Sequence, residues 1–394
     1  MTPGARLSAA IGLLDEILRG APADRVLTRW GRASRFAGSK DRAAVRDLVF
    51  DGLRRRRSLA WLGGSDTGRA IILAGQAVAG ENLASLFTGN GFDPSPVSSE
   101  EASNLSRTLD LAPLPVRLDV PDFLLPDLEV SLGSDAEAIL GRMRSRAPVD
   151  LRVNSLKSNR DAATVVLTRD GIATEPLSQS RLGLRVLENP RLVNASRAYS
   201  QGMVELQDVS SQIAAAFAGA EPGMTVLDYC AGGGGKTLAL AADMENAGRL
   251  MAWDANPRRM KDLPDRARRA TARITVLEPQ ALSKLGPVCD IVFVDAPCTG
   301  TGAWRRQPER KWLLDRGMLG KLEHLQQEIL SQAATHLRKG GSLIYCTCSL
   351  LRAENEEQIA RFLGAHPGWH LVSEQRLTPL DAGDGFYMAR LAGP

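Results

Sequence analysis

The segment MTVLDYCAGGGGKT, which spans residues 224–237, decides the fold class of this chain. It begins with a short apolar run that ends in Asp228, and four consecutive glycines follow before a helix-length segment. Further apolar runs alternate with helix-length segments, at residues 250–253, 274–277, 291–294 and 343–345. Nearly continuous apolar strands separated by helices are typical of a parallel sheet that is covered on both faces. We therefore predict a doubly wound α/β domain over residues 216–394.

The glycine run at residues 232–235 indicates a cofactor loop, because glycine lets a ligand approach the backbone closely at the edge of such a sheet. A phosphate-binding loop would need glycine at Cys230, and a dinucleotide-binding loop would need it at Thr237. The second strand ends at Asp254, whose carboxylate can accept both hydrogen bonds from a ribose diol. An adenosine cofactor without a pyrophosphate fits this pattern, and S-adenosylmethionine is the most common one. The alternative is a tight turn without a ligand.

Two further strand ends carry an acid and several thiols. Asp295 and Cys298 follow the apolar run at 291–294, and Cys346 and Cys348 follow the next run. A thiolate that adds to C6 of a pyrimidine makes C5 nucleophilic enough to take a methyl group, and the carboxyl group of Asp295 can hydrogen-bond the ring edge. The alternative is that these cysteines are small buried hydrophobes. Because an acid and two or three thiols share one sheet edge, we favour methyl transfer to a pyrimidine.

The composition of the 394 residues is that of a folded protein with two or three domains, since 44% are hydrophobic and 24% are charged. No stretch approaches the ~20 apolar residues of a membrane-spanning helix, and residues 1–19 lack the apolar centre of a signal peptide. Five cysteines without a Cys-x-x-Cys pair argue against a disulfide framework and against a metal site. These features predict a cytoplasmic protein with reduced thiols and no metal.

The N-terminal part has a different pattern. Apolar residues recur at helical spacing over residues 7–19 and 41–59, and prolines interrupt the helices between residues 90 and 130. Residues 1–57 hold 13 basic and 6 acidic residues, a balance of +7, whereas residues 58–150 hold 6 and 13, a balance of −7. The first helices can therefore form a basic face.

The residues between these two parts show a third pattern, in which short strands alternate with a helix. Short strands at residues 151–154 and 182–187 flank a helix-like stretch at 161–170, which predicts a small α+β domain. The predicted domains are therefore 1–140, 141–215 and 216–394.

Five short motifs stand out in the later part of the chain. They are Asp-Ala-Pro-Cys at 295–298, Thr-Cys-Ser at 347–349, Glu-Asn-Glu at 354–356, Leu-Gln-Asp-Val-Ser-Ser at 206–211 and Asp-Gly-Phe-Tyr-Met-Ala at 384–389. Together they resemble the RNA 5-methylcytosine methyltransferase family over residues 141–394. Residues 35–42 and the helix after them are similar to the NusB-like domain of the bacterial members that act on 16S ribosomal RNA. The resemblance implies a Rossmann-like class I methyltransferase domain, preceded by an RRM-like α+β domain and an all-α NusB-like RNA-binding domain.

The resemblance also implies roles for individual residues. The nucleophile of the family is the cysteine of the Thr-Cys-Ser motif, here Cys348, while Cys298 assists release of the product. Asp295 is expected to serve both catalysis and cofactor binding. The implied cofactor-binding residues are Cys230, Ala231, Gly232, Gly233, Gly234, Gly235, Lys236, Asp254, Arg259 and Asp295.

Two positions depart from the family pattern. Gly233 stands where the family usually has proline, so the loop backbone is freer. Many members also place an aspartate after the third strand to hold the adenine amino group, whereas this stretch reads Val-Leu-Glu-Pro-Gln at 276–280. Glu278 or Gln280 can take the place of that aspartate.

The segment WRRQPERKW at residues 304–312 interleaves cations with aromatic rings directly after the catalytic loop. Such a segment can pair with phosphates and stack on unpaired bases, which predicts RNA contacts from Arg305, Arg306, Arg310 and Lys311. A solvated charged turn is the alternative. Weaker candidates for RNA contacts are the arginines at 54–57, Arg142, Arg144 and Arg146.

Taken together, the residues and the resemblance predict an S-adenosylmethionine-dependent RNA cytosine-C5 methyltransferase. We expect it to act as a monomer on ribosomal RNA, and specifically on 16S rRNA. Two alternatives stay open, namely the same reaction on transfer RNA and a non-catalytic RNA-binding assembly factor of the same fold. The assembly factor would be expected to lack the two thiols, and both are present.

Overall fold

The computed structural model describes residues 1–381 and 383–394, and contacts within the chain group them into two units. The first unit comprises Met1–Arg146 and Trp304–Asp315, and the second comprises Ala147–Ala303 and Arg316–Pro394. The sequence placed the short segment Trp304–Asp315 inside the predicted catalytic domain, whereas its contacts lie with the N-terminal helices.

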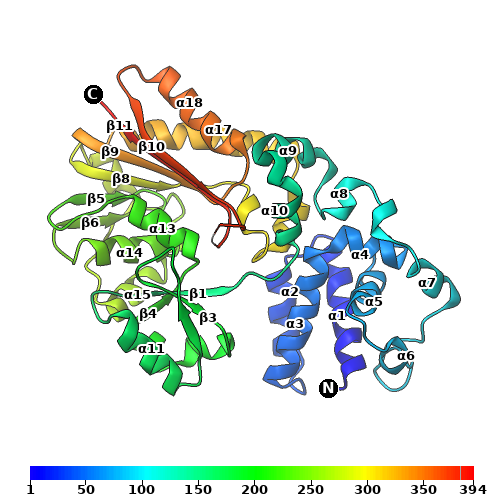
Figure 1. The fold of residues 1–394 in the computed structure, drawn as a ribbon. Coiled ribbons are helices and arrows are strands. Elements are labelled where there is room, and N and C mark those ends of the chain that lie inside the picture. Colours follow the sequence, from blue (N-terminus) through cyan, green and yellow to red (C-terminus); the bar gives the residue numbers. More distant parts are fainter. Residues whose placement is uncertain (382) are drawn as a thin grey trace. The chain divides into compact units, whose positions relative to one another are not determined.

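The first unit is helical and is built around α1 (Pro3–Leu18), α3 (Ser39–Arg54) and α5 (Gly68–Val78), which Figure 1 shows in blue. Thr2 caps α1, because its side chain accepts a hydrogen bond of 3.1 Å from the backbone N–H of Ala5. Apolar side chains at helical spacing bury one face of each helix in a common core. This core includes Leu7, Leu14, Ile17, Val45, Val49, Leu53, Ile71 and Leu73.

Residues 41–59 were predicted as one helix but form parts of two. α3 ends at Arg54 and α4 (Arg56–Gly63) begins directly after it, because Arg55 takes φ −115° and ψ 28° and interrupts the helical geometry. Most of the later helices in this unit are short, as the prolines predict. The remaining elements are α2 (Ala23–Ala33), α6 (Leu83–Leu86), α7 (Ser99–Asn104), η1 (Leu109–Leu111), α8 (Leu114–Arg117), η2 (Asp122–Leu124), α9 (Leu125–Leu132), η3 (Gly133–Asp135), α10 (Ala136–Met143) and α16 (Pro308–Leu313).

Hydrogen bonds fix the segment around α16 to the end of α3. Trp312 Nε1 donates to the carbonyl oxygen of Leu53 (2.8 Å), and Lys311 Nζ donates to that of Arg54 (3.1 Å). Arg54 Nε in turn donates to the carbonyl oxygen of Arg305 (2.8 Å). The last carbonyl groups of a helix have no partner within the helix, so these side chains satisfy the C-terminal end of α3.

The second unit begins with an antiparallel sheet whose strand order is β2-β3-β1-β4. Its strands are β1 (Val149–Val153), β2 (Thr174–Pro176), β3 (Gly183–Val186) and β4 (Val204–Leu206). The helical elements beside it are α11 (Arg160–Arg169), η4 (Pro190–Ala195) and α12 (Arg197–Ser200). The two short strands and the helix predicted in this part of the chain are confirmed within one or two residues.

A seven-stranded sheet with strand order β10-β11-β9-β8-β5-β6-β7 forms the rest of this unit. Its strands are β5 (Thr225–Asp228), β6 (Arg249–Ala252), β7 (Thr275–Val276), β8 (Cys289–Asp295), β9 (Leu337–Thr347), β10 (His370–Leu377) and β11 (Phe386–Ala392). The strands from β5 to β9 pair in parallel, while β10 and β11 extend the sheet in antiparallel direction. The predicted α/β class with a mainly parallel sheet is confirmed, and the β10–β11 hairpin was not foreseen.

Helices cover both faces of this sheet (Figure 1). α13 (Val209–Phe217) and α14 (Gly235–Asp243) pack on one face, where Val226 and Phe293 are buried. The opposite face packs against α17 (Arg316–Ala334) and α18 (Glu356–Ala365), and alternate residues of the same strands point there, as the pleat of a strand requires. The other helical elements are α15 (Leu263–Ala270), η5 (Pro257–Met260), η6 (Pro279–Lys284), η7 (Thr301–Ala303) and η8 (Arg352–Glu354).

The direction of the chain through the sheet reverses beside β5. β6 and β7 follow on one side of β5, and β8 and β9 then lie on its other side. In open α/β sheets, ligands bind outside the carboxyl ends of the strands at such a switch point. Asp228 ends β5 and Asp295 ends β8, so both acids lie at this position.

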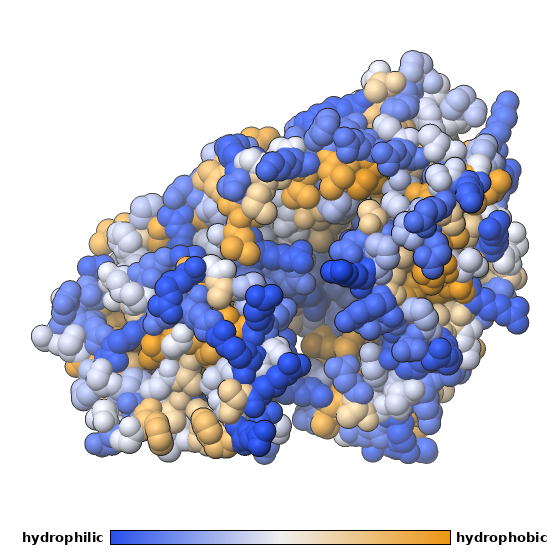
Figure 2. Space-filling view, turned by 180° about the vertical axis from the view of Figure 1, so that it is seen from behind, coloured by the Kyte–Doolittle hydropathy of each residue, from blue (hydrophilic) through white to orange (hydrophobic). Residues whose placement is uncertain are grey.

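The face of the molecule shown in Figure 2 is mostly hydrophilic, with smaller hydrophobic areas between the polar side chains. Within the part of the chain that the structure describes, no helix combines the length and the apolar character needed to cross a membrane. The same described residues contain no group of His, Cys, Asp and Glu side chains that could hold a metal ion.

Candidate active site

The glycine loop joins β5 to α14 at the carboxyl end of the sheet. Gly232 and Gly234 adopt φ values of 51° and 81°, which glycine reaches without strain. A Cβ atom at Gly234 would lie only 2.2 Å from Leu263 Cδ1, so packing against α15 excludes a side chain there. At Gly233 the φ angle is not positive, and a Cβ atom would meet Arg266 Nη1 at an ordinary 3.5 Å. The position where the family pattern has proline is therefore compatible with a side chain.

Asp254 follows β6 and ties the glycine loop to this strand. Its Oδ2 accepts a hydrogen bond from the backbone N–H of Gly232 (3.0 Å), and its Oδ1 accepts one from that of Asn256 (2.9 Å). Arg259 Nη1 lies 3.1 Å from the same Oδ2, and the side chain of Arg259 is 57% exposed while that of Asp254 is 4% exposed. Asp254 thus shapes the loop in addition to its predicted contact with a ribose.

Asp228 ends β5 below the glycine loop and is only 1% exposed. Its Oδ2 accepts a hydrogen bond of 2.6 Å from the hydroxyl of Thr237, in the first turn of α14. Among the described residues, its Oδ1 has no hydrogen-bond partner. Burial raises the pKa of Asp228 to about 7, although the Thr237 bond acts in the opposite direction. The base of the loop therefore holds a buried acceptor that lacks a donor.

Lys236 and Asp295 form an ion pair between α14 and the end of β8, with 2.8 Å between Lys236 Nζ and Asp295 Oδ2. Burial acts to lower the pKa of Lys236, but Asp295 and the nearby thiols of Cys348 and Cys346 outweigh it and raise this pKa. The ammonium group also lies 5.0 Å from the ring centre of Phe386. Lys236 is therefore a charged group in the first turn of α14, directly after the glycine loop, and it interacts electrostatically with the thiols.

Cys298 and Cys348 meet beyond the ends of β8 and β9. Their sulfur atoms are 3.5 Å apart, and both side chains are half-buried. The hydrogen bond with Cys348, together with burial, raises the pKa of Cys298 well above its ordinary value. The backbone N–H of Gly302 donates to the carbonyl oxygen of Cys348 (2.9 Å), which joins the two loops. The structure brings the two predicted catalytic cysteines together, and Cys298 keeps its proton at neutral pH.

Glu354 holds both cysteine loops and is fully buried. Its carboxylate accepts hydrogen bonds from the backbone N–H of Thr299 (2.8 Å), from the Thr299 hydroxyl and from the Ser349 hydroxyl. Gln326 Nε2 donates a further bond of 3.1 Å. Thr299 and Ser349 are the residues that directly follow the two cysteines. Through one side chain, Glu354 fixes the spacing of the two thiol-bearing loops.

Asn355 also supports the second cysteine loop. Thr347 Oγ1 donates to Asn355 Oδ1 (2.6 Å), and Asn355 Nδ2 donates to the carbonyl oxygen of Ser349 (3.0 Å). The hydroxyl of Tyr345 donates to the carbonyl oxygen of Glu354 (2.7 Å). The sequence alone does not reveal the role of Glu354, because two of its partners, Thr299 and Gln326, lie far from it in the chain.

Two family patterns match the chain. Residues 217–392 match the family described as 16S rRNA methyltransferase RsmB/F, and residues 120–194 match the ferredoxin-like domain of RsmF/B-like methyltransferases. A relative from Citrobacter koseri, named Ribosomal RNA small subunit methyltransferase B, is 34% identical over 284 residues. The chain is therefore similar to the RsmB/F methyltransferase family. The alignment covers 69% of this chain and 66% of that relative, just under two thirds of its length.

Two solved structures resemble this chain. The crystal structure of PH0851 has a TM-score of 0.78 and 25% identity, and the match covers 100% of this chain and 99% of that one. The structure of NSun6 from Pyrococcus horikoshii with SFG has a TM-score of 0.62 and 19% identity, and covers 69% of this chain and 98% of that one. The second likeness concerns the fold alone.

Most residues predicted for cofactor binding lie at one edge of the sheet, on the glycine loop, at the start of α14, after β6 and at the end of β8. Cys230 is half-buried in this loop, and burial raises the pKa of its thiol. Glu278 and Gln280, the two candidates for holding the adenine amino group, are both exposed after β7. Neither side chain is held in a buried position as Asp254 is. Cys346, the third thiol at this sheet edge, is fully buried and packs in the hydrophobic core.

The structure contradicts the predicted RNA contacts of Arg305 and Lys311. Arg305 is 2% exposed and Lys311 is 1% exposed. The ammonium group of Lys311 lies 5.5 and 4.6 Å from the ring centres of Trp304 and Trp312, and burial lowers the pKa of Lys311 to about 8. A buried cation cannot reach the phosphates of a nucleic acid, so these two side chains stabilise the helical unit instead.

Some of the other basic residues predicted to contact RNA are accessible to solvent, and others are buried. Arg310 is exposed and Arg306 is half-buried, so both stay candidates for RNA contacts. Arg54 is buried and is therefore excluded, whereas Arg56 and Arg57 are half-buried and line a pocket. The alternation of charge and aromatic residues did not separate these cases, because α16 buries one of its faces.

Proposed function

We propose that this protein transfers a methyl group from S-adenosylmethionine to C5 of a cytosine in 16S ribosomal RNA. The observation that carries this proposal is the 3.5 Å approach of the Cys298 and Cys348 sulfur atoms at the sheet edge that also holds the glycine loop. The name of the Citrobacter koseri relative favours small-subunit ribosomal RNA over transfer RNA. The buried network around the two thiols favours an enzyme over a non-catalytic assembly factor.

The residues around the glycine loop fit S-adenosylmethionine. Asp228 Oδ1 is a buried acceptor without a partner among the described residues, and the α-ammonium group of the cofactor is a suitable donor. A carboxylate offers about four acceptor sites, of which Asp254 already uses three. A ribose diol would need two, so the exposed side chain of Arg259 would have to move aside. When bound, the cofactor supplies an electrophilic methyl group.

Cys348 is the better placed of the two thiols for attack on C6 of the cytosine. The raised pKa of Cys298 keeps that thiol protonated, which leaves Cys348, whose sulfur lies 3.5 Å away, as the thiol for attack. The ammonium group of Lys236 interacts electrostatically with the same sulfur. Addition of the Cys348 thiolate forms a carbon–sulfur bond at C6 and moves electron density to C5, which then takes the methyl group.

The remaining groups serve charge stabilisation and release. The carboxylate of Asp295 can accept a hydrogen bond from the cytosine amino group, and Lys236 offsets the negative charge that builds on the ring. Loss of the C5 proton to a base then breaks the bond between C6 and Cys348, restores the ring double bond and returns the thiolate. Cys298 lies 3.5 Å from the departing sulfur, a position from which it can assist this step.

We further infer a division of labour along the chain. Residues 1–140 would act as a NusB-like RNA-binding domain and 141–215 as an RRM-like domain, while 216–394 would carry the transferase. The helical core of the first part and the antiparallel sheet of the second support this division. The segment Trp304–Asp315 is the exception, because it packs with the helices.

Bisulfite sequencing of total RNA tests the proposed function. A cytosine of 16S rRNA should resist conversion in cells that hold the gene and should convert in cells that lack it, and purified protein with S-adenosylmethionine should restore the resistance. Resistance that changes in transfer RNA instead would favour the alternative substrate. If no cytosine in any RNA responded, the proposed function would be wrong.

A further inference from the structure

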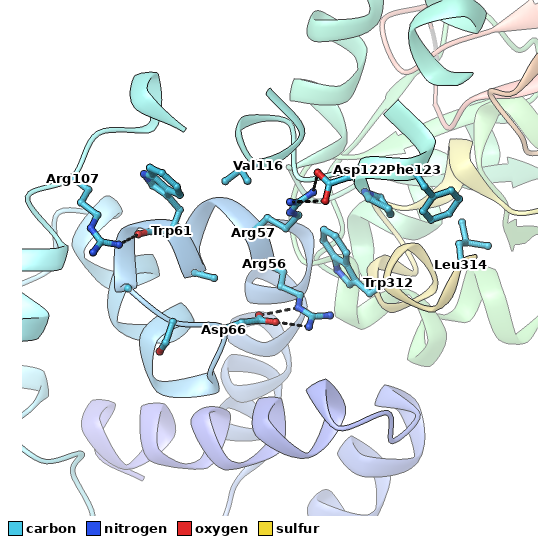
Figure 3. A pocket seen from close by; sticks show the side chains of 14 residues that line it. Arg56, Arg57, Trp61, Asp66, Arg107, Val116, Asp122, Phe123, Trp312 and Leu314 are labelled. Carbon is cyan, nitrogen blue, oxygen red and sulfur yellow. Dashed lines mark hydrogen bonds and ion pairs between the residues drawn. The ribbon is translucent and has the colours of Figure 1, made fainter. Parts of the chain in front are cut away.

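A pocket of about 790 Å³ opens within the helical unit (Figure 3). Its lining comes from α4, the turn after α4, the segment between α7 and η1, α8, η2 with the residue before it, and the segment that contains α16. Pockets for small ligands and cofactors usually measure about 300 to 1,000 Å³, so one or two nucleotides would fit this space. Its lining residues belong to neither the cysteine loops nor the glycine loop, and they have no role in the reaction described above.

Three aromatic rings line the pocket, from Trp61, Phe123 and Trp312. Trp61 Nε1 donates to the carbonyl oxygen of Thr108 (3.2 Å), and Trp312 Nε1 donates to that of Leu53 (2.8 Å). Both indole rings are half-buried, so they are ordered before any ligand arrives. Stacking on ordered aromatic rings is the common way in which proteins hold unpaired bases, since every base has a flat face.

Three arginines stand among these rings. Arg56 forms two hydrogen bonds with Asp66, at 2.9 and 2.6 Å, and Arg57 forms two with Asp122, at 2.8 and 3.1 Å. The side chains of these acids are 51% and 72% exposed, and ion pairs with exposed acids are weak, so a phosphate can replace either carboxylate.

Arg107 differs from the other two arginines. Its side chain is exposed and donates one hydrogen bond of 3.2 Å to the carbonyl oxygen of Trp61. In the described parts of the chain, no carboxylate lies within ion-pair distance of Arg107. Figure 3 shows it beside Trp61 at one end of the pocket, with Arg56 and Trp312 toward the other. Each end of the pocket therefore pairs an indole ring with a guanidinium group.

We propose that this pocket binds one or two unpaired nucleotides of the RNA substrate. The bases stack on Trp61 and Trp312, and the phosphates pair with Arg107 and with one of the arginines of α4. An acidic peptide would also suit the arginines, but its carboxylates would not stack on the rings of Trp61 and Trp312. The inference rests on the proposed function only in taking RNA as the substrate, and it adds a second contact point for that RNA on the helical unit.

Fluorescence anisotropy with a labelled single-stranded RNA twelve-mer, and with the same RNA as a duplex, tests the proposal on the full chain. Arg107→Ala removes an exposed side chain and should weaken single-strand binding about fivefold and lower the slope of its salt dependence by about 0.7. Trp61→Ala should weaken it about tenfold, while Trp61→Phe keeps a ring and should retain most of the affinity. Arg25→Ala removes an equally exposed arginine of α2 and should leave binding within twofold.

The outcomes separate the pocket from general attraction to RNA. Equal losses for Arg107→Ala and Arg25→Ala would overturn the proposal, as would unchanged affinity in Arg107→Ala. Equal losses for the duplex and the single strand would also overturn it, because a duplex offers no unpaired base. If Trp61→Ala fails to fold, Arg107→Ala and Trp61→Phe still decide the question. Methyl transfer by the unaltered protein is measured alongside, so its absence would count against the proposed function and not against the pocket.

Discussion

The cysteine loops and the glycine loop lie at the same edge of the seven-stranded sheet but are held in different ways. Glu354 fixes the cysteine loops through buried side-chain hydrogen bonds from Thr299 and Ser349. The glycine loop is shaped by backbone conformation and by one carboxylate, that of Asp254. A buried polar network loses more than one contact when a single member is removed. We therefore expect substitutions in the cysteine loops to be more damaging than those around the glycine loop.

The largest effect is expected at the nucleophile. Cys348→Ala should reduce methyl transfer to background, at least a thousandfold, because an alanine methyl group cannot add to C6. Incorporation of radioactive methyl groups into 16S rRNA measures this loss. Cys289→Ala serves as the control, since this buried thiol lies at the start of β8 and not at the end that carries the site. More than a tenth of the native activity in Cys348→Ala would contradict the assigned role.

The buried carboxyl below the glycine loop predicts a pH dependence. Burial raises the pKa of Asp228 from 3.8 to about 7, so between pH 4 and pH 7 the folded protein retains a proton that the unfolded chain has lost. This group therefore lowers stability as the pH rises through that interval. Asp228→Asn cannot titrate, so its stability relative to the native protein should rise by about 4 kcal/mol between pH 4 and pH 8.

Urea unfolding of both proteins at pH 4.5, 6 and 8 measures the effect of Asp228. The difference in unfolding free energy between the two proteins is the relevant quantity, because other titrating groups cancel in it. A difference that stays constant with pH would show that Asp228 ionises normally.

A substitution of Glu354 should damage the cysteine loops while both thiols remain. Glu354→Gln places an amide donor against hydroxyl and backbone donors, which should lower the unfolding free energy by about 2 to 3 kcal/mol and slow methyl transfer. The matched control is Glu357→Gln in the first turn of α18, where the side chain is exposed and a change within about 0.5 kcal/mol is expected. Equal losses of unfolding free energy in the two variants would contradict the role of Glu354 in positioning the cysteine loops.

The smallest of these effects concerns the cofactor. Asp254→Ala should weaken binding of S-adenosylmethionine by about 1.5 to 3 kcal/mol, the scale of lost hydrogen bonds to a charged group. Isothermal calorimetry on the full chain measures it, with Asp265→Ala as a control because that acid is 80% exposed on α15. Unchanged affinity in Asp254→Ala would show that Asp254 does not bind the cofactor and only forms its hydrogen bonds with Gly232 and Asn256.

The sequence predicted the parts of the fold that depend on local patterns. The apolar runs at 225–227 and 291–294 are strands of the sheet, because strands buried on both faces need continuous apolar sequence. β10 escaped prediction because most of its residues are exposed and it has no such run. The break between α3 and α4 depends on a single residue, Arg55, whose conformation no periodicity reveals.

The candidate site was predictable to the extent that strand ends define it. Asp295, Cys298 and Cys348 follow two neighbouring parallel strands, and topology alone brings such residues to one edge. The role of Glu354 was not predictable, because its bond to Thr299 joins positions 55 apart. Lys311 was misassigned because a pattern of charges does not show which face of a short helix is buried.

Trapping of a covalent adduct between enzyme and RNA tests the central claim most directly. Cys298→Ala and Cys348→Ala, each as the full chain, would be incubated with S-adenosylmethionine and 16S rRNA and separated by denaturing gel electrophoresis. Cys298→Ala should leave a protein–RNA species that survives denaturation, because Cys348 still attacks while release is impaired, and Cys348→Ala should leave none. An adduct in Cys348→Ala and none in Cys298→Ala would reverse the two roles. The absence of adducts from both variants, with methylation intact in both, would contradict the covalent mechanism.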